Sequence, residues 1–513
     1  MQQLGALDAM FAYTETRNTP MHIGQMLIYD PATAPGGKVG FKDILRYIEG
    51  RLDGAGMFRQ KLVRVPLDLD HPYWIEDENF DLEYHVRHIA LPQPGDWRQL
   101  CIQAARIYAR PLDMERPLWE FTVIEGLDNV QGVPKGSFAV LHKFHHAAMD
   151  GQSGVQMTVA LHDLDAKMTP RQWPTKWQPE TKPGDLTLLA LAQINNIANP
   201  VRGLKTLGKL LPVPKQIFNF ARDNKQQKGS GAAVPKTRLN RKMSPHRVFD
   251  ATLFTLNDIK TIRSAYPGVT VNDVMLTVVG GTLRAYLDSK GELPDVTLKA
   301  GAPVSLRDSN GDAAGGNQVA MMQVGLGTHI ADPAERLAFV ARETSRSKEM
   351  NEAVGAKALM ELSGAMPAGL TAAAAKLATR MGLGQTTFPQ INTVVTNVPG
   401  PSAAMYFAGS ELKRSFGMGL PTDGMGIFHT VTSYNGDVML TITADRDMLP
   451  DPATYIAMAD KSFAALMAAA KKTSAAKKSK PIKTTAKKPN KPLTTSSATA
   501  RKGRRKETVI PHR

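Results

Sequence analysis

Three histidines, an aspartate and a glycine lie close together in the first third of this 513-residue chain. They are His142, His145, His146, Asp150 and Gly151. A neutral imidazole is the side chain best suited to take a proton from a hydroxyl or a thiol near pH 7. The pattern His-His-x-x-x-Asp-Gly therefore indicates a site of proton transfer.

The segments on either side of this pattern predict how the histidines are held. Residues 138–141 are apolar and favour a strand, whereas residues 152–161 favour a helix. A strand that runs into a tight turn can hold a base rigidly at the edge of a pocket. Asp150 either approaches His146 or turns away and holds the turn through an arginine. Gly151 indicates a backbone position with no room for a Cβ, or with positive φ.

Two other interpretations of the histidines remain. In the first, they end a strand and are satisfied by backbone groups. In the second, His142, His145 and His146 bind a metal ion. The metal interpretation is weaker, because no nearby carboxylate or cysteine completes a plausible ligand set. We therefore expect no metal site.

The charge of the chain is concentrated at its C-terminal end. Residues 471–513 hold 15 Lys and Arg against Glu507 alone, which is +14 of the total +16 and leaves +2 for the first 470 residues. Such a Lys-, Ala-, Ser- and Thr-rich tail is expected to be disordered. It could touch anionic lipid, or nucleic acid nonspecifically, or serve only to aid solubility.

Other features of the composition favour a cytoplasmic protein. Cys101 is the only cysteine, so no internal disulfide can form and a reducing compartment fits. The first ten residues do not resemble a secretion signal, and no uninterrupted run of about 18 apolar residues predicts a transmembrane helix. The basic amphipathic stretch 201–220 either lies on the inner membrane or a lipid-droplet surface, or packs on the first domain.

Strands and helices alternate along the chain and predict a layered α/β (α+β) fold. The expected strands cover residues 22–29, 62–66, 73–75, 121–125, 249–256, 298–306, 317–326 and 392–397, with a hairpin over 426–444. The expected helices cover residues 41–52, 97–110, 186–198, 271–286, 333–353, 359–381 and 451–470. We divide the chain into an N-terminal domain (1–180), a helical or flexible crossover (181–247), a C-terminal domain (248–470) and the tail (471–513).

Residues 145–151, His-His-Ala-Ala-Met-Asp-Gly, resemble the HHxxxDG signature of the bacterial wax ester synthase/diacylglycerol acyltransferases. These enzymes are relatives of condensation domains and chloramphenicol acetyltransferase. Further segments resemble family motifs in the right order: 19–22, 116–120 around Pro-Leu-Trp, Asn272-Asp273, 303–307 and 396–401. Together they cover about residues 1–470. Residues 415–419 are only loosely similar to the DFGWG segment of the wider superfamily, and we assign them no role. Residues 116–120 most simply form a strand with a buried tryptophan.

The resemblance implies two chloramphenicol-acetyltransferase-like domains that face each other, with a tunnel between them and the histidines at its middle. It implies that His146 is the general base and that His145 supports or orients it. Asp150 then clamps the turn by pairing with Arg307, and Gly151 permits tight packing.

The resemblance also bears on the oxyanion and on the substrates. Asn272, Asn397 or backbone N–H groups are candidates to stabilise the oxyanion, and Asp273 is a further candidate beside Asn272. The plain alternative for Asn272 and Asp273 is that they cap a helix. No Gly-x-Ser-x-Gly elbow is present, so no acyl-enzyme is expected. Acyl-CoA is then a substrate, and no cofactor is needed.

The resulting prediction is an O-acyltransferase that moves a long-chain acyl group from acyl-CoA to diacylglycerol, to a fatty alcohol, or to both. It would associate peripherally with the inner membrane or with lipid inclusions. One alternative is a condensation-domain-like acyltransferase that acts on another hydroxyl or on an amine. The other alternative is a noncatalytic protein that binds lipid droplets through the basic tail.

Overall fold

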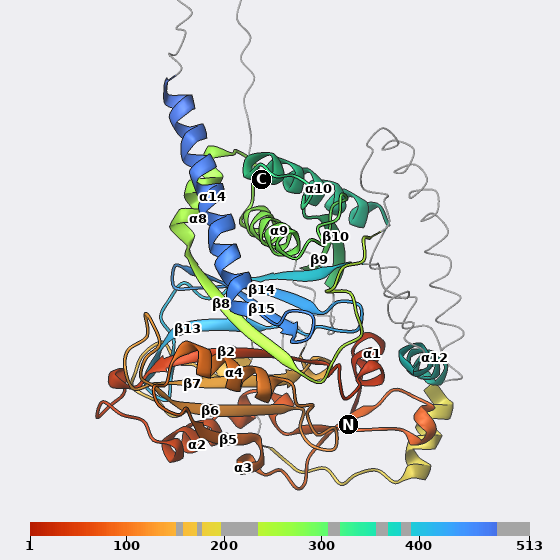
Figure 1. Ribbon diagram of the computed structural model, residues 1–513. Coiled ribbons are helices and arrows are strands. Elements are labelled where there is room, and N and C mark those ends of the chain that lie inside the picture. Colours follow the sequence, from red (N-terminus) through yellow and green to blue (C-terminus); the bar gives the residue numbers. More distant parts are fainter. Residues whose placement is uncertain are drawn as a thin grey trace, which may run out of the picture.

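The computed structural model describes residues 1–149, 157–171, 177–195, 234–305, 319–354, 368–380 and 391–479. Two six-stranded sheets lie one above the other (Figure 1). The first has the order β12-β13-β2-β7-β6-β5 and the second the order β10-β9-β11-β14-β15-β8. A small sheet, β1-β4-β3, lies beside the first. Mixed layers of this kind confirm the predicted fold class.

The strands of the first sheet are β2 (His22–Asp30), β5 (Val86–Ala90), β6 (Trp119–Leu127), β7 (Ser137–His145), β12 (Tyr406–Phe407) and β13 (Ser410–Met418). Those of the second are β8 (Arg247–Thr255), β9 (Lys299–Ser305), β10 (Val319–Gly325), β11 (Thr393–Val398), β14 (Ile427–Tyr434) and β15 (Asp437–Asp445). The small sheet consists of β1 (Gln2–Gln3), β3 (Gln60–Val63) and β4 (Tyr73–Glu76). Every residue of β7 is buried, as expected for a central strand covered on both faces.

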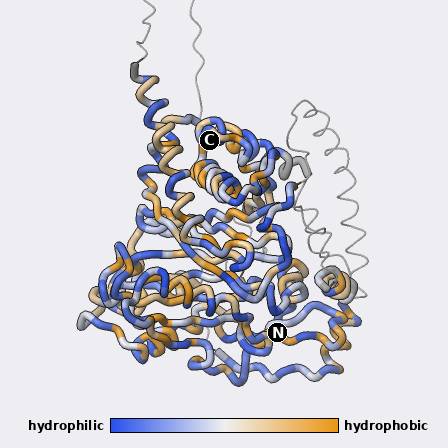
Figure 2. Tube along the Cα trace, viewed as in Figure 1, coloured by the Kyte–Doolittle hydropathy of each residue, from blue (hydrophilic) through white to orange (hydrophobic). Residues whose placement is uncertain are grey.

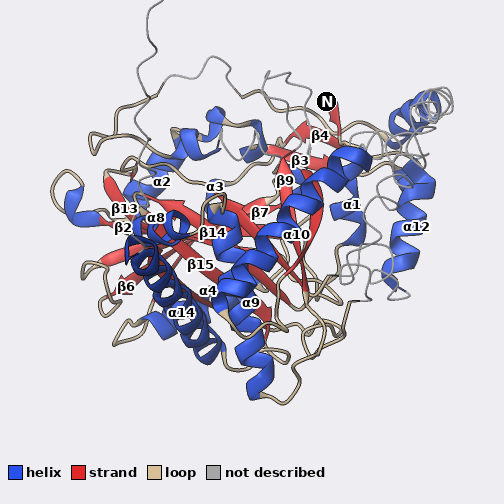
Figure 3. Ribbon diagram, turned by 90° about the horizontal axis from the view of Figure 1, so that it is seen from above, coloured by secondary structure: helices blue, strands red, loops and turns tan. Residues whose placement is uncertain are grey.

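The helices are α1 (Ala6–Thr14), α2 (Phe41–Glu49), α3 (Leu82–His85), α4 (Trp97–Tyr108), α8 (Leu256–Ala265), α9 (Val271–Ser289), α10 (Pro333–Val354), α12 (Ala368–Arg380) and α14 (Pro452–Ser479). Seen from above, α9, α10 and α14 lie together over the second sheet (Figure 3). No helix in the described ranges is both long enough and apolar enough to cross a bilayer.

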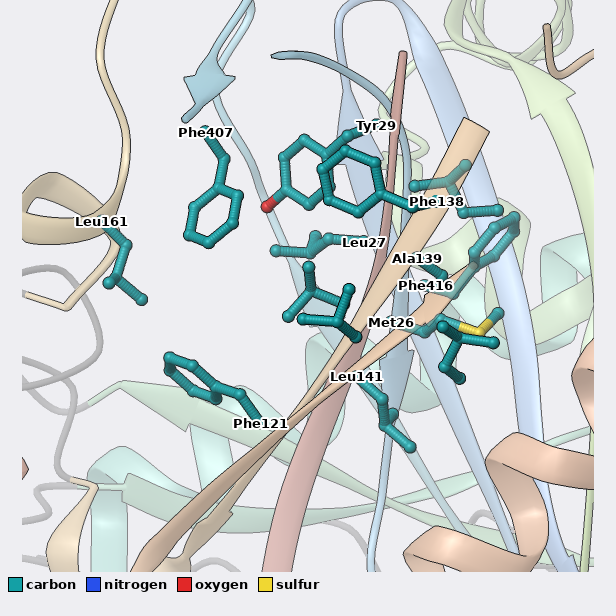
Figure 4. Close-up of a cluster of buried hydrophobic side chains, with 14 of the residues drawn as sticks. Met26, Leu27, Tyr29, Phe121, Phe138, Ala139, Leu141, Leu161, Phe407 and Phe416 are labelled. Carbon is teal, nitrogen blue, oxygen red and sulfur yellow. The ribbon is translucent and has the colours of Figure 1, made fainter. Parts of the chain in front are cut away.

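Strand β13 comes from the second half of the chain but pairs with β2 in the first sheet. Figure 4 shows Phe407 and Phe416 packed among side chains of the N-terminal half, and the ring centroids of Phe407 and Tyr29 are 5.1 Å apart. The sequence predicted no strand over residues 406–418, and a strand in any case carries no mark of the sheet that it joins. The two halves are therefore joined by a shared sheet as well as by facing surfaces.

The last helix is longer than predicted. α14 continues through Ser479, so residues 471–479 are helical and the prediction of disorder is wrong for them. The Lys477 ammonium donates to the Ala265 carbonyl over 2.8 Å, and the hydroxyls of Thr473 and Tyr266 lie 3.1 Å apart. Figure 2 shows apolar and polar positions alternating along α14, as expected for a helix with one packed face. Residues 480–513 lie outside the described part of the chain.

Candidate active site

The histidines lie where the central strand of the first sheet ends. His145 is the last residue of β7 and is paired with His22 of β2. The His145 amide donates to the Leu118 carbonyl over 2.9 Å, and the His146 amide donates to the Met21 carbonyl over 2.8 Å. Residues His146–Ala148 then form one turn of 3₁₀ helix. Backbone bonds to both sides therefore fix the turn, as the apolar strand before it predicted.

The His145 side chain is fully buried, and both of its ring nitrogens have partners. Nδ1 accepts a hydrogen bond from the Ala147 amide at 3.1 Å, so Nε2 carries the proton and donates it to Glu15 Oε2 at 3.2 Å. The other Glu15 oxygen accepts from the Met21 amide at 3.4 Å. With both nitrogens engaged, His145 orients the turn and has no lone pair to offer a substrate.

His146 has a different environment. Its ring stacks on Phe11 of α1, with the centroids 4.0 Å apart and the planes at 11°. The pKa of His146 is lowered to about 4, chiefly because the ring is buried; a hydrogen bond to the backbone of His146 itself opposes the fall, and the neighbouring His145 adds slightly to it. The imidazole is therefore neutral at pH 7, which is the state that a general base requires.

His142 is not part of this arrangement. Side chains alternate along a strand, so His142 and His145, three positions apart, project from opposite faces of β7. His142 stacks on Phe121 at 4.2 Å, and neither of its ring nitrogens has a partner in the described chain. Burial, assisted by His162, lowers the pKa of His142 to about 3. The three histidines therefore cannot share one metal ion.

Of the site residues predicted in the second half of the chain, the structure assigns a role to one, Asp273. Asp273 forms a capping box at the start of α9: its Oδ2 accepts from the Thr270 amide and hydroxyl at 2.8 and 2.7 Å. This is the capping role that we left open for it. Asn272 and Asn397 are half-buried, and their site role stays a prediction. Asp150, Gly151 and Arg307 lie outside the described residues, so the predicted clamp stays a prediction too.

Several residues around the site were not predicted from the sequence. Phe11 and Glu15 both come from α1 and its C-terminal end, and neither belongs to a recognisable motif. Helix α12, from the second half, packs on α1: Ala372 and Ala375 join Tyr13 in one buried cluster. The side of the turn that α1 covers is therefore built by both halves of the chain.

Residues 415–419, to which we assigned no role, have a structural one. A Cβ on Gly419 would lie 1.9 Å from the Phe428 ring, and a Cβ on Gly417 would lie 2.3 Å from Thr430. The Tyr108 hydroxyl lies within 2.8 Å of the Gly419 carbonyl. These contacts join β13 and α4 to the second sheet. In segment 116–120, Trp119 is buried and donates to the Phe58 carbonyl over 2.9 Å, which confirms the structural interpretation.

The paired layers and the neutral histidine at a strand end are features of acyltransferases with two facing domains. Comparison with known proteins is more specific. Residues 4–275 match the family model "wax ester synthase/diacylglycerol acyltransferase catalytic domain", and residues 315–467 match the corresponding C-terminal domain. The chain belongs to the wax ester synthase/diacylglycerol acyltransferase family.

Individual relatives agree with this assignment. A Mycobacterium tuberculosis protein named as a diacylglycerol O-acyltransferase is 32% identical over 452 residues, which is 88% of this chain and 87% of that protein. The solved wax ester synthase/diacylglycerol acyltransferase from Marinobacter aquaeolei VT8 is 26% identical, with a TM-score of 0.63 over 92% of this chain and 100% of that one. The first condensation domain of the calcium-dependent antibiotic synthetase has a TM-score of 0.53 at 12% identity over 91% of this chain and 96% of that domain, which shows a shared fold.

Proposed function

We propose that the protein transfers a long-chain fatty acyl group from acyl-CoA to the hydroxyl of diacylglycerol, of a long-chain alcohol, or of both. The observation that carries this proposal is the neutral imidazole of His146, held in a rigid turn at the end of β7 and stacked on Phe11. Membership of the family supplies the class of substrates. Both acceptors present the same group, a hydroxyl, to the same base.

The reaction needs no covalent enzyme intermediate. The neutral imidazole of His146 takes the proton from the acceptor hydroxyl as the hydroxyl oxygen attacks the thioester carbonyl. The resulting oxyanion needs hydrogen-bond donors, for which Asn272, Asn397 and backbone amides are the candidates. The tetrahedral intermediate then collapses: the carbon–sulfur bond breaks, and the imidazolium returns the proton to the CoA thiolate. His146 ends neutral, with an ester and free CoA as products.

The first test is the loss of the base. Purified protein is given palmitoyl-CoA with hexadecanol, with diacylglycerol, or with neither, and release of free thiol is followed. We expect acceptor-dependent release, and a fall of at least about 10³-fold in kcat for His146→Ala. His88→Gln, on the exposed part of β5, serves as the matched control and should keep full activity.

The His146 variant must also keep its far-ultraviolet circular dichroism, so that lost turnover is not lost folding. Retained acyl transfer by folded His146→Ala would exclude His146 as the base. An amine acceptor in the same panel tests the condensation-like alternative, which predicts amide formation in preference to ester formation.

We further propose that the protein works at the surface of a membrane or lipid inclusion. Its acceptors are lipids, and residues 201–220 and the Lys- and Arg-rich end supply apolar and basic side chains suited to an anionic lipid surface. Sedimentation with vesicles of phosphatidylglycerol, compared with phosphatidylcholine, tests this. Equal recovery in the supernatant with both would contradict it.

A further inference from the structure

An arginine-lined cavity of about 510 Å³ lies at the junction of the two halves. Its lining consists of Arg17, Arg106, Ala109, Arg110, Pro111, Pro245, His246, Arg247 and Arg446. Five of these residues are arginines and none is acidic. The size lies within the range of pockets that hold small molecules and cofactors. The arginines come from four separate places: the turn before β2, the end of α4, the start of β8 and the segment after β15.

Among the described residues, side-chain partners are found for one of these five guanidinium groups, that of Arg247. Arg247 is buried, lies 3.7 Å from a carboxylate oxygen of Asp445 and donates to the Ser244 carbonyl over 2.7 Å. The side chains of Arg17, Arg106, Arg110 and Arg446 are exposed, and within the described residues they form no ion pair or side-chain hydrogen bond.

Residues 1–470 carry a net charge of only +2, so this cluster is a local concentration of charge. A favourable interaction with the negative end of α4 accounts for Arg106 and Arg110. It does not account for Arg17 or Arg446, which lie on other segments.

The cavity lies on the same side of the first sheet as His145. Lys143 and His145 are two residues apart on β7 and project from one face. The buried Lys143 ammonium donates to the Arg110 carbonyl over 3.0 Å, which holds the end of α4 against that face. His22, the strand partner of His145, donates from Nε2 to the Tyr108 carbonyl over 2.7 Å. Arg17 and His22 are five positions apart along the chain, so their Cα atoms are at most about 18 Å apart.

We propose that this cavity binds the phosphate groups of the acyl-CoA donor, while the linear pantetheine arm extends toward His146. The proposal rests on the acyl-CoA donor of the proposed function. Coenzyme A carries a diphosphate and a 3′-phosphate, on the order of four negative charges in total. The planar guanidinium group of arginine pairs with phosphate oxygens through two parallel hydrogen bonds, and four available groups match such a polyanion.

The kinetic test distinguishes an effect on phosphate binding from an effect on the reaction of the thioester. Arg106→Gln/Arg110→Gln is assayed with palmitoyl-CoA and with palmitoyl-N-acetylcysteamine, which has the same thioester but no phosphate. We expect KM for palmitoyl-CoA to rise at least about tenfold with kcat little changed, and no change in kcat/KM for the short thioester. Arg98→Gln, exposed on the same helix but outside the cavity, is the matched control.

An equal effect of the double substitution on both thioesters would overturn the proposal, because the arginines would then act on something other than phosphate. Arg446→Gln, on the opposite half of the chain, provides a second variant if the α4 double variant does not fold. It should raise KM for palmitoyl-CoA alone in the same way.

Measuring the binding of CoA tests the cavity assignment separately from acyl transfer. Calorimetry with CoA alone needs no turnover. The wild type and Arg98→Gln should bind CoA equally, and both should bind dephospho-CoA more weakly. The affinity of Arg106→Gln/Arg110→Gln for CoA should fall at least about tenfold. Unchanged CoA binding in the double variant would refute the cavity assignment even if acyl transfer is observed. If instead the substitutions abolish binding to phosphatidylglycerol vesicles and leave CoA binding intact, the cavity serves lipid headgroups and the proposal is wrong.

Discussion

At the scale of single residues, the two adjacent histidines have separate tasks because they face separate partners. His145 uses both ring nitrogens, on the Ala147 amide and the Glu15 carboxylate. His146 stacks on Phe11 and has its pKa lowered by burial, which keeps the ring neutral. The sequence pattern ranked His146 as the base by resemblance. The structure adds a physical reason, which is the difference in how the two rings are engaged.

The lowered pKa of His146 predicts an unusual pH profile. A base that protonates at about pH 4 is fully available from pH 5 to 8, so kcat/KM should be level across that range and fall below about pH 4. Assays with palmitoyl-CoA over pH 3.5–8 measure this, with circular dichroism at each pH and recovery of activity at pH 7 as controls for unfolding. A break near pH 6.5 would mean that the ring is solvated and the assignment of its state is wrong.

Glu15 is predicted to act as a positioning residue. Glu15→Ala leaves the buried His145 Nε2–H without an acceptor, so we expect a loss of about 1–3 kcal/mol in the free energy of unfolding and a lower kcat at similar KM. Glu15→Gln offers an amide oxygen in the same place and should restore most of both. If Glu15→Gln is as impaired as Glu15→Ala, an oxygen that accepts from His145 is not sufficient, and the negative charge of Glu15 matters instead.

At the scale of elements, the shared sheet is what brings the two halves together. Strand β13 pairs with β2, and its last residues lie against β14 of the other sheet. Helix α4 crosses the same junction: the Trp97 indole N–H donates to Asp250 over 2.8 Å, and Tyr108 reaches the Gly419 carbonyl. The close approach of β13 and β14 leaves no room for a side chain on the glycines between them.

This close approach predicts that Gly419→Ala is destabilising. The added methyl group would overlap the Phe428 ring, so we expect a loss of about 1–3 kcal/mol in the free energy of unfolding and reduced acyl transfer. Urea denaturation of the variant measures the first effect. Gly184→Ala has no atom within 4 Å of the new Cβ and should be neutral. Equal stability of the two variants would show that β13 and β14 separate without cost.

At the scale of the whole molecule, helices of the second half pack on elements of both halves. Residues 471–479 extend α14 along α8. Helix α12 packs on α1, whose Phe11 ring stacks on His146. The charge is also unevenly distributed over the whole molecule. Residues 1–470 are nearly neutral and residues 471–513 are strongly basic, while the arginines of the cavity lie together at the junction of the two halves. The position of a charge in the fold therefore matters more to its role than the total of +16.

Two deletions test where the folded part ends. Removing residues 480–513 should leave the midpoint of thermal unfolding and the rate of acyl transfer unchanged. Removing residues 471–513 also removes the Lys477 and Thr473 contacts with the end of α8, and should cost about 1–2 kcal/mol. Thermal denaturation and the palmitoyl-CoA assay measure both effects. An equal loss of stability from the two deletions would contradict the helical end of α14.

The sequence by itself determined many of the elements and the family, because apolar periodicity and short ordered motifs are local properties of the chain; it did not predict α1, β5, α8 or β13. It indicated the strand over residues 138–141 that leads into the histidines, the helix that begins after Thr270 and the buried Trp119. Only the tertiary structure decided which sheet β13 joins, that Glu15 and Phe11 flank the histidines, and that arginines from four places line one cavity. Those facts depend on contacts between residues tens to hundreds of positions apart, which a local pattern does not encode.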